Sequence, residues 1–575
     1  MIGRISAAAI RSFACVLVLW AATSTVTTAA SSPSAWEKLA QEFIEATFAI
    51  DPVRAVREGR HEHDGELPDL SAAGITAQIE HYRAWRERAR AFDPTELSRR
   101  DAFERELLVW HCDSQLFWLE TARWPFRNPE FYSGYLSPSV YVTRPYASKS
   151  VRLAALTRYA SAIPEALAQV RANLAGDLPR PYVERAIGFF GGLARHLADE
   201  VPPLFADVDD AELQRDFTAA NARAAAAFRD AAAWLQAKLP TPYGEYAMGA
   251  ALFSEMLART ELIDTPLAEL ETRNDRDLAR NRAALDAACR VLHPNPDAAF
   301  STAACVARVD AEKPAHGPVA RGTEQLVALR RFVVEHDLVS VPLPDEARVA
   351  EAPPYRRANL AYIERPGRYE KVQLPSVYYI SPPDPSWTAE EQRAYLPSEA
   401  NLLFVSSHEV WPGHFLHGLH RRAHAGPLGG LLGSYAFTEG WAHYAEEMMW
   451  DAGLGNADPK LHVGQLVSAL WRNVRFRSAI GLHTKGMTVA ESERLFREEA
   501  FLDPGNARQQ AARGTYDPGY LAYTLGKLQI LELRDAWIAR RGGRAAWKAF
   551  HDELLSWGAP PLPLLARYME AGGRN

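Results

Sequence analysis

Apolar residues recur every three or four positions through much of the chain, which is the periodicity of amphipathic helices. The pattern is clearest in six stretches, at residues 36–48, 75–92, 104–119, 153–174, 211–239 and 266–291. Two of them begin with signals expected at a helix start, because Asp209 precedes one and Thr265-Pro266 opens another. The sequence therefore predicts a mainly α protein.

Between Arg368 and Pro382 the pattern changes, because β-favouring residues such as Val377, Tyr378 and Ile380 gather there. This segment predicts a short strand or hairpin. A sheet edge beside a catalytic centre can bind an extended peptide by strand addition, while an ordinary connecting hairpin explains the same residues. The sequence leaves both interpretations open.

Residues 1–30 are typical of a signal peptide, with Arg4 and Arg11, an apolar run over residues 13–22, and small residues up to Ala30. The run is too short for a permanent membrane span, and no later stretch approaches about twenty uninterrupted apolar residues. Cys15 lies inside the run, which argues against a lipoprotein cleavage site. We therefore expect an exported protein, periplasmic or secreted, without a stable membrane anchor.

After this leader we expect an N-terminal helical lobe over residues 31–350 and a C-terminal lobe over residues 351–575, with a Pro-rich seam at 341–355. A chain of 575 residues that is 47% hydrophobic can bury a large core. Its 64 basic and 71 acidic residues are spread along the chain. This balance implies no field that would recruit nucleic acid, and no nucleic-acid partner is expected.

An oxidising compartment would allow two of the three remaining cysteines to pair. Cys289 and Cys305 flank a Pro-containing loop between two Ala-rich segments, so they are the best-placed pair. Three unpaired thiols, with Cys112 as the third, fit the sequence equally well.

The candidate chemistry begins at residues 406–420, which read SSHEVWPGHFLHGLH. A His-Glu pair entering a helix opens the zinc hydrolase signature, in which the imidazole binds the metal and the carboxylate accepts a proton from water. The usual second ligand lies four residues on, where this chain has Pro412. The next imidazole, His414, would lie about 120° from His408 around an unbroken helix. Because Pro412 cannot donate a hydrogen bond and Gly413 is conformationally free, we expect a kink or bulge that brings both imidazoles together.

A catalytic zinc site needs a third protein ligand and one open position. Glu439 opens a second predicted helix 25 residues after His414, beyond a Gly-rich turn. We expect His408, His414 and Glu439 to bind the metal, with Glu409 as the general base. Glu446, one heptad after Glu439, can face the same way and orient a ligating imidazole. The other histidines of the region compete as ligands: His417, His420, His424 and His443.

These motifs, taken in order along the chain, resemble a known bacterial family. The patterns His408-Glu409-x-x-Pro412-Gly413-His414 and Glu439-Gly440-Trp441-Ala442-x-Tyr444-x-Glu446 are similar to the family catalogued as domain of unknown function 885. Further matches are residues 265–270, residues 481–487, Pro518-Gly519 with Tyr523 and Gly526, and Glu532-Leu533-Arg534. Because the matches cover most of the mature chain, it is identified as a member of that family.

The family resembles the helical zinc peptidases of the neurolysin and thermostable carboxypeptidase type. This resemblance implies two helical lobes around a deep, zincin-like cleft with one zinc ion on its floor. It also implies catalytic roles for His483 and Tyr523, which would stabilise the oxyanion of a tetrahedral intermediate. From the residues alone, Tyr523 fits a core or rim aromatic and His483 a helix-end imidazole equally well. Phe415, His417 and Tyr520 depart from the residues usual in the family, which leaves the substrate preference open.

The sequence thus favours a zinc-dependent hydrolase, and most simply a peptidase that cleaves oligopeptides with Glu409 as general base. Two alternatives stay open: a non-catalytic exported protein that binds peptide or metal, and a metal-dependent amidase or esterase acting on a small metabolite. A purely structural metal site needs no base beside a ligand, so Glu409 favours an enzyme. Two imidazoles and one carboxylate favour zinc over manganese.

Overall fold

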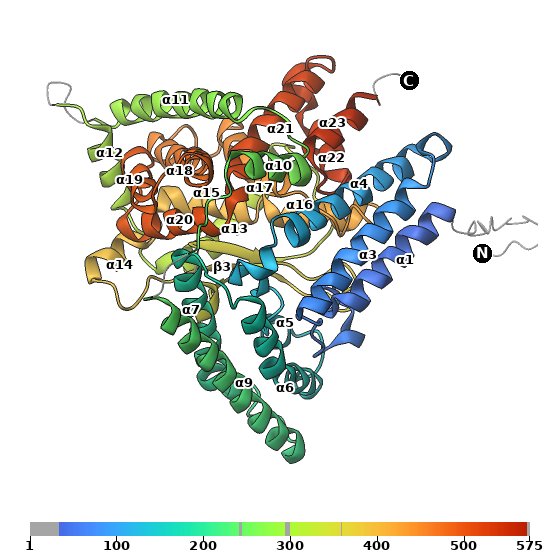
Figure 1. The fold of residues 1–575 in the computed structure, drawn as a ribbon. Coiled ribbons are helices and arrows are strands. Elements are labelled where there is room, and N and C mark those ends of the chain that lie inside the picture. Colours follow the sequence, from blue (N-terminus) through green and yellow to red (C-terminus); the bar gives the residue numbers. More distant parts are fainter. Residues whose placement is uncertain (1–33, 241–243, 294–298, 358, 572–575) are drawn as a thin grey trace, which may run out of the picture.

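The computed structural model describes residues 34–571, apart from 241–243, 294–298 and 358. Helices make up most of this part of the chain (Figure 1), and each of the six predicted stretches is helical, so the mainly α fold is confirmed. The helices before the sheet are α1 (Ala35–Ile50), α2 (Pro52–Arg57), α3 (Ala72–Arg90), α4 (Arg99–Leu116), α5 (Ser139–Thr143), α6 (Lys149–Asn173), α7 (Arg180–Arg195), α8 (Val201–Leu204), α9 (Ala211–Lys238), α10 (Ala250–Glu261), α11 (Leu267–Val291), α12 (Thr302–Asp310) and α13 (Gly317–Glu335). Those after it are α14 (Ala389–Tyr395), α15 (Glu399–Glu409), α16 (His414–His424), α17 (Tyr435–Asp451), α18 (Pro459–Thr484), α19 (Val489–Glu499), α20 (Pro504–Tyr516), α21 (Ala522–Ile538), α22 (Trp547–Ser556) and α23 (Leu562–Ala571).

The sheet found among the described residues has three strands: β1 (Ala347–Glu351), β2 (Ala361–Glu364) and β3 (Ser376–Ile380). Their order is β1-β3-β2, with β1 parallel and β2 antiparallel to β3. The predicted strand is therefore present as β3, and it forms a hairpin with the preceding antiparallel strand β2, which lies before Arg368; both partners of β3 come from earlier in the chain. One of them, β1, lies inside the stretch expected to be a seam. Since β3 is central and buried, strand addition at this segment is excluded, and β2 is the edge strand on its side.

Most buried apolar side chains among the described residues fall into two clusters. The larger joins α1, α3 and α4 to α10–α13 and to the helices of the C-terminal half, while the smaller is built mainly from α6, α7 and α9. In Figure 1 the helices of the smaller cluster extend below β3, whereas α17, α18 and α21 lie above it. Helices from the N-terminal half thus contribute to both cores, and the division of the chain at residue 350 stays a prediction.

Helices α17 and α21 approach each other closely at two glycines. A Cβ atom on Gly440 would lie 2.5 Å from the backbone of Gly526, and one on Gly526 would overlap the carbonyl oxygen of Ala436. A residue with any side chain at either position would push the helices apart. This contact holds Glu439, which precedes Gly440, and Tyr523, one turn before Gly526, on facing helices.

A buried group of charges supports α17 on the side of α11 and α21. Lys527 is fully buried and lies 2.9 Å from Asp277 Oδ2 and 3.2 Å from Glu447 Oε2. Arg280 binds the other oxygen of Glu447 at 2.6 Å, and Asn473 donates to Asp277 at 3.0 Å. Burial alone would raise the pKa of Glu447, but Lys527 and Arg280 lower it to about 2. The charges compensate one another, so they can lie in the interior at tolerable cost.

This group predicts a specific loss of stability in acid. Because the folded-state pKa of Glu447 lies below its value in an unfolded chain, its contribution is present above about pH 4.5 and is lost as pH falls toward 2. Urea unfolding at pH 5 and pH 3 will show a smaller drop in the free energy of unfolding for Glu447→Gln than for the wild type. An equal drop in both proteins would contradict the coupling.

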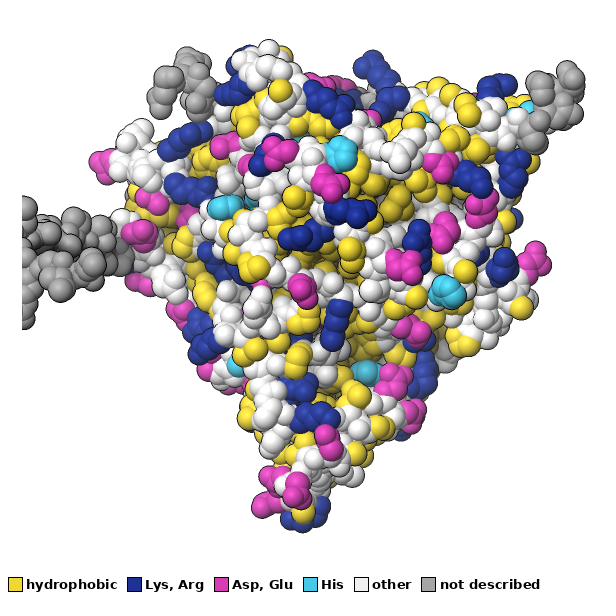
Figure 2. All heavy atoms as spheres, turned by 180° about the vertical axis from the view of Figure 1, so that it is seen from behind, with side chains coloured by type: hydrophobic (Ala, Val, Ile, Leu, Met, Phe, Trp, Pro, Cys, Tyr) yellow, Lys and Arg dark blue, Asp and Glu magenta, His cyan; other side chains and the backbone are white. Residues whose placement is uncertain are grey.

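The structure contains a disulfide between Cys289 and Cys305, and Cys112 is buried as a free thiol. The predicted signal peptide, residues 1–30, lies outside the described residues. Within the described residues, no helix combines the length and apolar character needed to cross a membrane. Figure 2 shows acidic and basic side chains intermixed over one face of the molecule, which agrees with the even spread of charge along the sequence.

Candidate metal centre and its pocket

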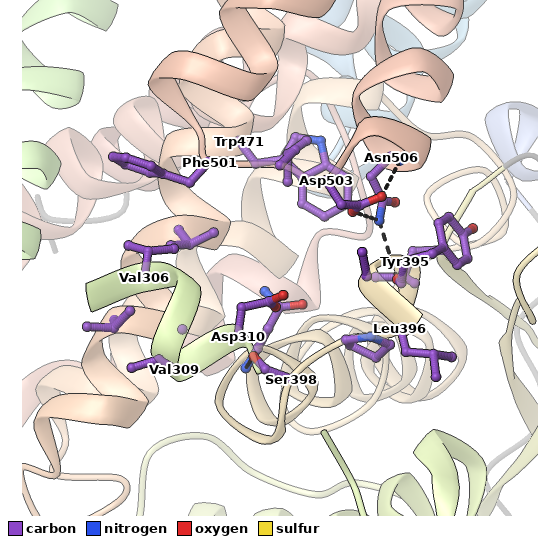
Figure 3. Close-up of a pocket in the computed structure, with 18 residues that line it drawn as sticks. Val306, Val309, Asp310, Tyr395, Leu396, Ser398, Trp471, Phe501, Asp503 and Asn506 are labelled. Atoms are coloured by element: carbon purple, nitrogen blue, oxygen red, sulfur yellow. Dashed lines mark hydrogen bonds between the residues drawn. The ribbon is translucent and has the colours of Figure 1, made fainter. Parts of the chain in front are cut away.

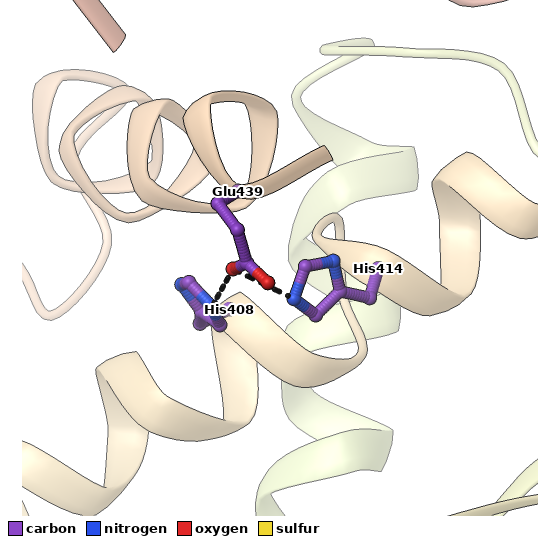
Figure 4. A group of neighbouring side chains, drawn as sticks. All are labelled: His408, His414 and Glu439. Atoms are coloured by element: carbon purple, nitrogen blue, oxygen red, sulfur yellow. Dashed lines mark ion pairs between the residues drawn. The ribbon is translucent and has the colours of Figure 1, made fainter. Parts of the chain in front are cut away.

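Three helix ends bring the predicted ligands together. His408 lies at the end of α15, His414 opens α16, and Glu439 lies in the second turn of α17 (Figure 4). The Nε2 atoms of His408 and His414 are each 3.3 Å from the same oxygen of Glu439, and one potential ligand atom from each residue lies within 4.8 Å of the other two. Donor atoms about 2.0–2.1 Å from a common tetrahedral centre stand about 3.3–3.4 Å apart, so the two separations to Glu439 match those of a tetrahedral metal site.

The break between the two histidines is complete. Instead of one kinked helix, the structure has two helices joined at residues 410–413, with a cis bond between Trp411 and Pro412. The amide of Gly413 donates to the carbonyl of Ser407 at 3.0 Å, and the indole of Trp441 donates to the carbonyl of Pro412 at 2.9 Å. The chain therefore folds back on the end of α15, which turns His414 toward the same point as His408.

Only glycine fits at position 413, because a Cβ atom there would overlap the carbonyl oxygen of His408. We expect Gly413→Ala to lower the free energy of unfolding by about 1–3 kcal/mol and to reduce the metal bound per chain. Thermal unfolding and elemental analysis of the purified protein measure both effects. Gly188→Ala is the matched control, because its Cβ would meet nothing within 4 Å in α7, and it should retain full metal content.

Glu446 orients His408 by binding Nδ1, the ring nitrogen on the side away from Glu439. Its Oε1 is 2.8 Å from Nδ1 of His408, and its Oε2 accepts from Ser468 at 2.7 Å. Although burial alone would raise it, Arg472 and His408 hold the pKa of Glu446 well below its ordinary value, and Arg472 lies 3.2 Å from Oε1. An ionised Glu446 accepts a hydrogen bond from Nδ1–H of His408, which fixes the tautomer that leaves a lone pair on Nε2 for the metal.

Glu409 is buried beside the three candidate ligands. Burial raises the pKa of its carboxyl group, while His414 and His408 act in the opposite direction. One of its oxygens, Oε2, has no hydrogen-bond partner among the described residues. A carboxylate with a free oxygen at this position can accept a proton from water in the pocket.

The candidate ligands and Glu409 line a pocket of about 300 Å³, and Tyr523 also lines it. The ring of Tyr523 stacks on that of His408 with centroids 6.1 Å apart, and its hydroxyl accepts from Arg513 at 3.2 Å. Since this bond uses a lone pair, the phenol proton stays available for an oxyanion in the pocket.

His483 lies elsewhere, which differs from the expectation for this residue. Its imidazole is fully buried, its Nε2 is 2.8 Å from the carbonyl of Gly514, and its ring stacks on Phe253. It does not line the pocket of the metal centre, because α18 carries it beyond the pocket wall. We therefore leave His483 out of the proposed chemistry.

The competing histidines also lie outside the cluster. His417 and His420 place Nε2 at 3.0 and 2.8 Å from the carbonyls of Gly558 and Ser340, and His424 is exposed at the end of α16. His443 is buried with Nδ1 at 3.6 Å from Glu446. None of these four joins the group that could hold a metal ion within the described chain.

Four arginines in the pocket wall were not anticipated from the sequence: Arg365, Arg472, Arg475 and Arg513. Arg475 is buried, donates to Gln510 at 2.9 Å and lies under the ring of Tyr523 at 4.4 Å. Burial lowers its pKa to about 10, so it stays charged at neutral pH. The three-residue spacing of Arg472 and Arg475, which puts both on one helix face, was the available signal.

A smaller cavity of about 60 Å³ shares Leu360 and Trp471 with the pocket (Figure 3). Asn506 bridges its polar side by donating to Asp503 at 2.6 Å and to the carbonyl of Tyr395 at 3.4 Å. Its volume suffices for about four to six water molecules. The candidate metal ligands and Glu409 line the pocket of about 300 Å³ and not this smaller cavity.

A family model described as "Bacterial protein of unknown function (DUF885)" matches residues 52–569. The chain belongs to the DUF885 family. The resemblance inferred from the motifs is thereby confirmed. No curated protein sequence matches the chain.

Solved structures share the fold of this DUF885 protein. A candidate lipoprotein of unknown function from Shewanella oneidensis has a TM-score of 0.75 at 21% identity, covering 94% of this chain and 100% of its own. A candidate lipoprotein from Colwellia psychrerythraea has a TM-score of 0.77 at 17% identity, covering 94% and 99%. At such identities the likeness shows the fold alone. The M32 carboxypeptidase from Deinococcus radiodurans R1 reaches a TM-score of only 0.33 at 12% identity, covering 93% and 94%, and carries no argument about function.

Proposed function

We propose that this DUF885 protein is an exported zinc-dependent peptidase that cleaves oligopeptides. The observation that carries the proposal is the convergence of His408, His414 and Glu439, with both imidazole Nε2 atoms 3.3 Å from one Glu439 oxygen and with Glu409 beside them in the wall of a pocket. A bound zinc ion would supply Lewis acidity toward water and toward a carbonyl oxygen. Manganese remains the alternative ion, although two imidazoles favour zinc.

The protein's own groups can carry the proton transfers. Glu409 accepts a proton from the water that attacks the scissile carbonyl, and then returns it to the leaving amine. The hydroxyl of Tyr523 donates to the oxygen that becomes negative in the tetrahedral intermediate. Arg513 supports this step, because its guanidinium group donates a hydrogen bond to the hydroxyl oxygen of Tyr523 and so makes that hydroxyl a stronger donor.

The edge strand can align a peptide. Three residues of β2 (Ala361, Tyr362 and Ile363) line the pocket, and β2 pairs with β3 on one side only within the described residues. Its free backbone groups can therefore pair with an extended substrate. The strand that serves this role is β2, rather than the segment around β3 expected from the sequence.

Export is part of the same proposal. The leader at residues 1–30 supports it, and so does the disulfide between Cys289 and Cys305, because disulfides persist in oxidising compartments. Removal of the leader can be checked from the N-terminal sequence of the mature protein.

A second candidate function is an amidase or esterase acting on a small metabolite. The pocket volume of about 300 Å³ favours it, since that is at the lower end for small-molecule sites. The larger neighbouring cavity described below gives a peptide more room.

The test is cleavage of a mixed peptide library by the purified protein, with and without a chelator. We expect new peptide fragments that disappear with chelator and return on addition of zinc. Absence of cleavage by metal-loaded protein, or cleavage unaffected by complete metal removal, would overturn the proposal. Turnover of small amides or esters but of no peptide would favour the second candidate.

A further inference from the structure

A second cavity, larger than the metal pocket, adjoins it. It has a volume of about 670 Å³ and shares Ile363 and Arg365 with the metal pocket. Eight arginines line it, against four acidic residues. We call this cavity the arginine chamber. Its composition contrasts with the near balance of charge in the whole chain.

Ion pairs neutralise part of this charge. Arg422 pairs closely with Asp345, and Arg356 lies 3.6 Å from Glu364. The other two acidic groups of the chamber accept hydrogen bonds from backbone amides: Asp51 accepts from the amide of Arg54, and Glu58 accepts from the amide of Arg368. An excess of positive charge therefore remains.

Six of the eight guanidinium groups of the chamber make no ion pair with any residue that the structure describes, and four of these six are those of Arg54, Arg365, Arg368 and Arg421. They donate to backbone carbonyls instead: Arg54 to Leu431 at 3.2 Å, Arg365 to His414 at 2.6 Å, Arg368 to Arg421 at 3.1 Å and Ala425 at 3.2 Å, and Arg421 to Gly430 at 3.2 Å and Leu432 at 3.3 Å. The Nε of Arg421 is buried and has no hydrogen-bond partner among the described residues. A buried donor without a partner costs free energy that a bound acceptor would recover.

These cations also lie close to one another. Burial, and next the charge of Arg365, lower the pKa of Arg421 to about 10. Two glycines make room for the group, because a Cβ atom on Gly418 would lie 2.8 Å from Cδ of Arg365 and one on Gly430 would overlap the guanidinium of Arg368. The fold therefore holds like charges together, an arrangement that a bound anion would stabilise.

We propose that the arginine chamber binds the carboxylate groups of an acidic peptide whose scissile bond lies in the metal pocket. The inference rests on the proposed function and adds the substrate class, namely peptides with two or more Glu or Asp residues near the cleaved bond. Arg365 and Ile363 border both cavities, so the two cavities adjoin at the end of the edge strand β2 that would align the peptide. The planar guanidinium group matches the two oxygens of a carboxylate, which suits arginine to this recognition.

Binding tests the proposal apart from catalysis. In metal-loaded Glu409→Gln protein, a Glu-rich hexapeptide will bind at least about tenfold more tightly than its Gln analogue, and added salt will reduce the difference. In the same background, Arg421→Gln and Arg54→Gln will each remove about tenfold of the preference, whereas Arg421→Lys will retain more of it. Arg215→Gln, at an exposed position on α9, is the matched control. Thermal unfolding of each variant shows whether it is folded.

The outcomes separate this inference from the proposed function. Equal affinity for the Glu and Gln peptides would overturn the inference, even if the wild type cleaves peptides. A Glu preference that depends on Arg54 and Arg421, in a protein that cleaves no peptide, would support the chamber and overturn the peptidase. If inorganic phosphate binds in a manner that requires Arg421, and the Glu peptide does not bind, the chamber is a phosphate site. This outcome would overturn the inference.

Discussion

Replacing Glu409 by glutamine will abolish nearly all hydrolysis while the protein keeps its metal. The amide is nearly the same size as the carboxylate but cannot accept a proton, so the general base is lost without a cavity. Removal of a general base costs about 10²–10⁴-fold in rate. The decrease should appear in kcat, because the variant leaves the proposed substrate contacts with β2 and the arginines unchanged. Initial rates on a cleaved peptide, together with metal content, measure both parts.

The control for this variant lies on the same helix. Glu399→Gln changes a carboxylate in the first turn of α15, which binds Arg321 at 2.8 Å outside the pocket, and it should leave the rate within about twofold. Unchanged turnover in Glu409→Gln would refute its role as base. Loss of metal from the variant would instead make Glu409 a ligand.

Replacing His414 by alanine will remove the metal. This change deletes one of three protein ligands, and the two that remain cannot enclose an ion that needs three from the chain. Replacement of a group that only orients a ligand already costs about 10–100-fold in metal affinity, so loss of the ligand itself should exceed about 100-fold. Zinc bound per chain, measured by elemental mass spectrometry after dialysis, should fall from one toward zero.

His424→Ala provides the matched control, because this exposed residue ends the same helix, α16. It should retain the zinc content of the wild type. Equal zinc in His414→Ala and the wild type would remove His414 from the site. Zinc lost equally in both variants would point to damage of α16 rather than to a missing ligand.

The helical fold was predictable because its signal is local. Apolar residues at three and four residue spacing, together with cap residues, predicted six helical stretches that the structure contains. The sheet was only partly predictable. The residues of β3 favour a strand, but its partners β1 and β2 come from separate segments, and β1 stands in a stretch whose prolines indicated a seam. Strand pairing depends on contacts between distant residues, which periodicity does not record.

The candidate site shows the same division. His408, Glu409 and His414 stand close in sequence, and their spacing around Pro412 required a break that the structure contains. His483 was expected in the pocket by family resemblance, yet the course of α18 takes it to Gly514. The arginines without ion pairs were not predicted, because Arg54, Arg368 and Arg421 come from distant segments of the chain. Whether an arginine has an acidic partner can be seen only in the three-dimensional structure.

The helical character, the family, and the residue types that can hold zinc and accept a proton all follow from the order of the amino acids. Each depends on neighbouring positions or on short motifs. The three-dimensional fold was needed to show that Gly413 turns His414 back toward His408, that β2 rather than β3 borders the pocket, and that eight arginines line one chamber. The physical reason is that metal coordination, strand pairing and charge compensation are set by distances of a few ångströms between residues that lie far apart along the chain.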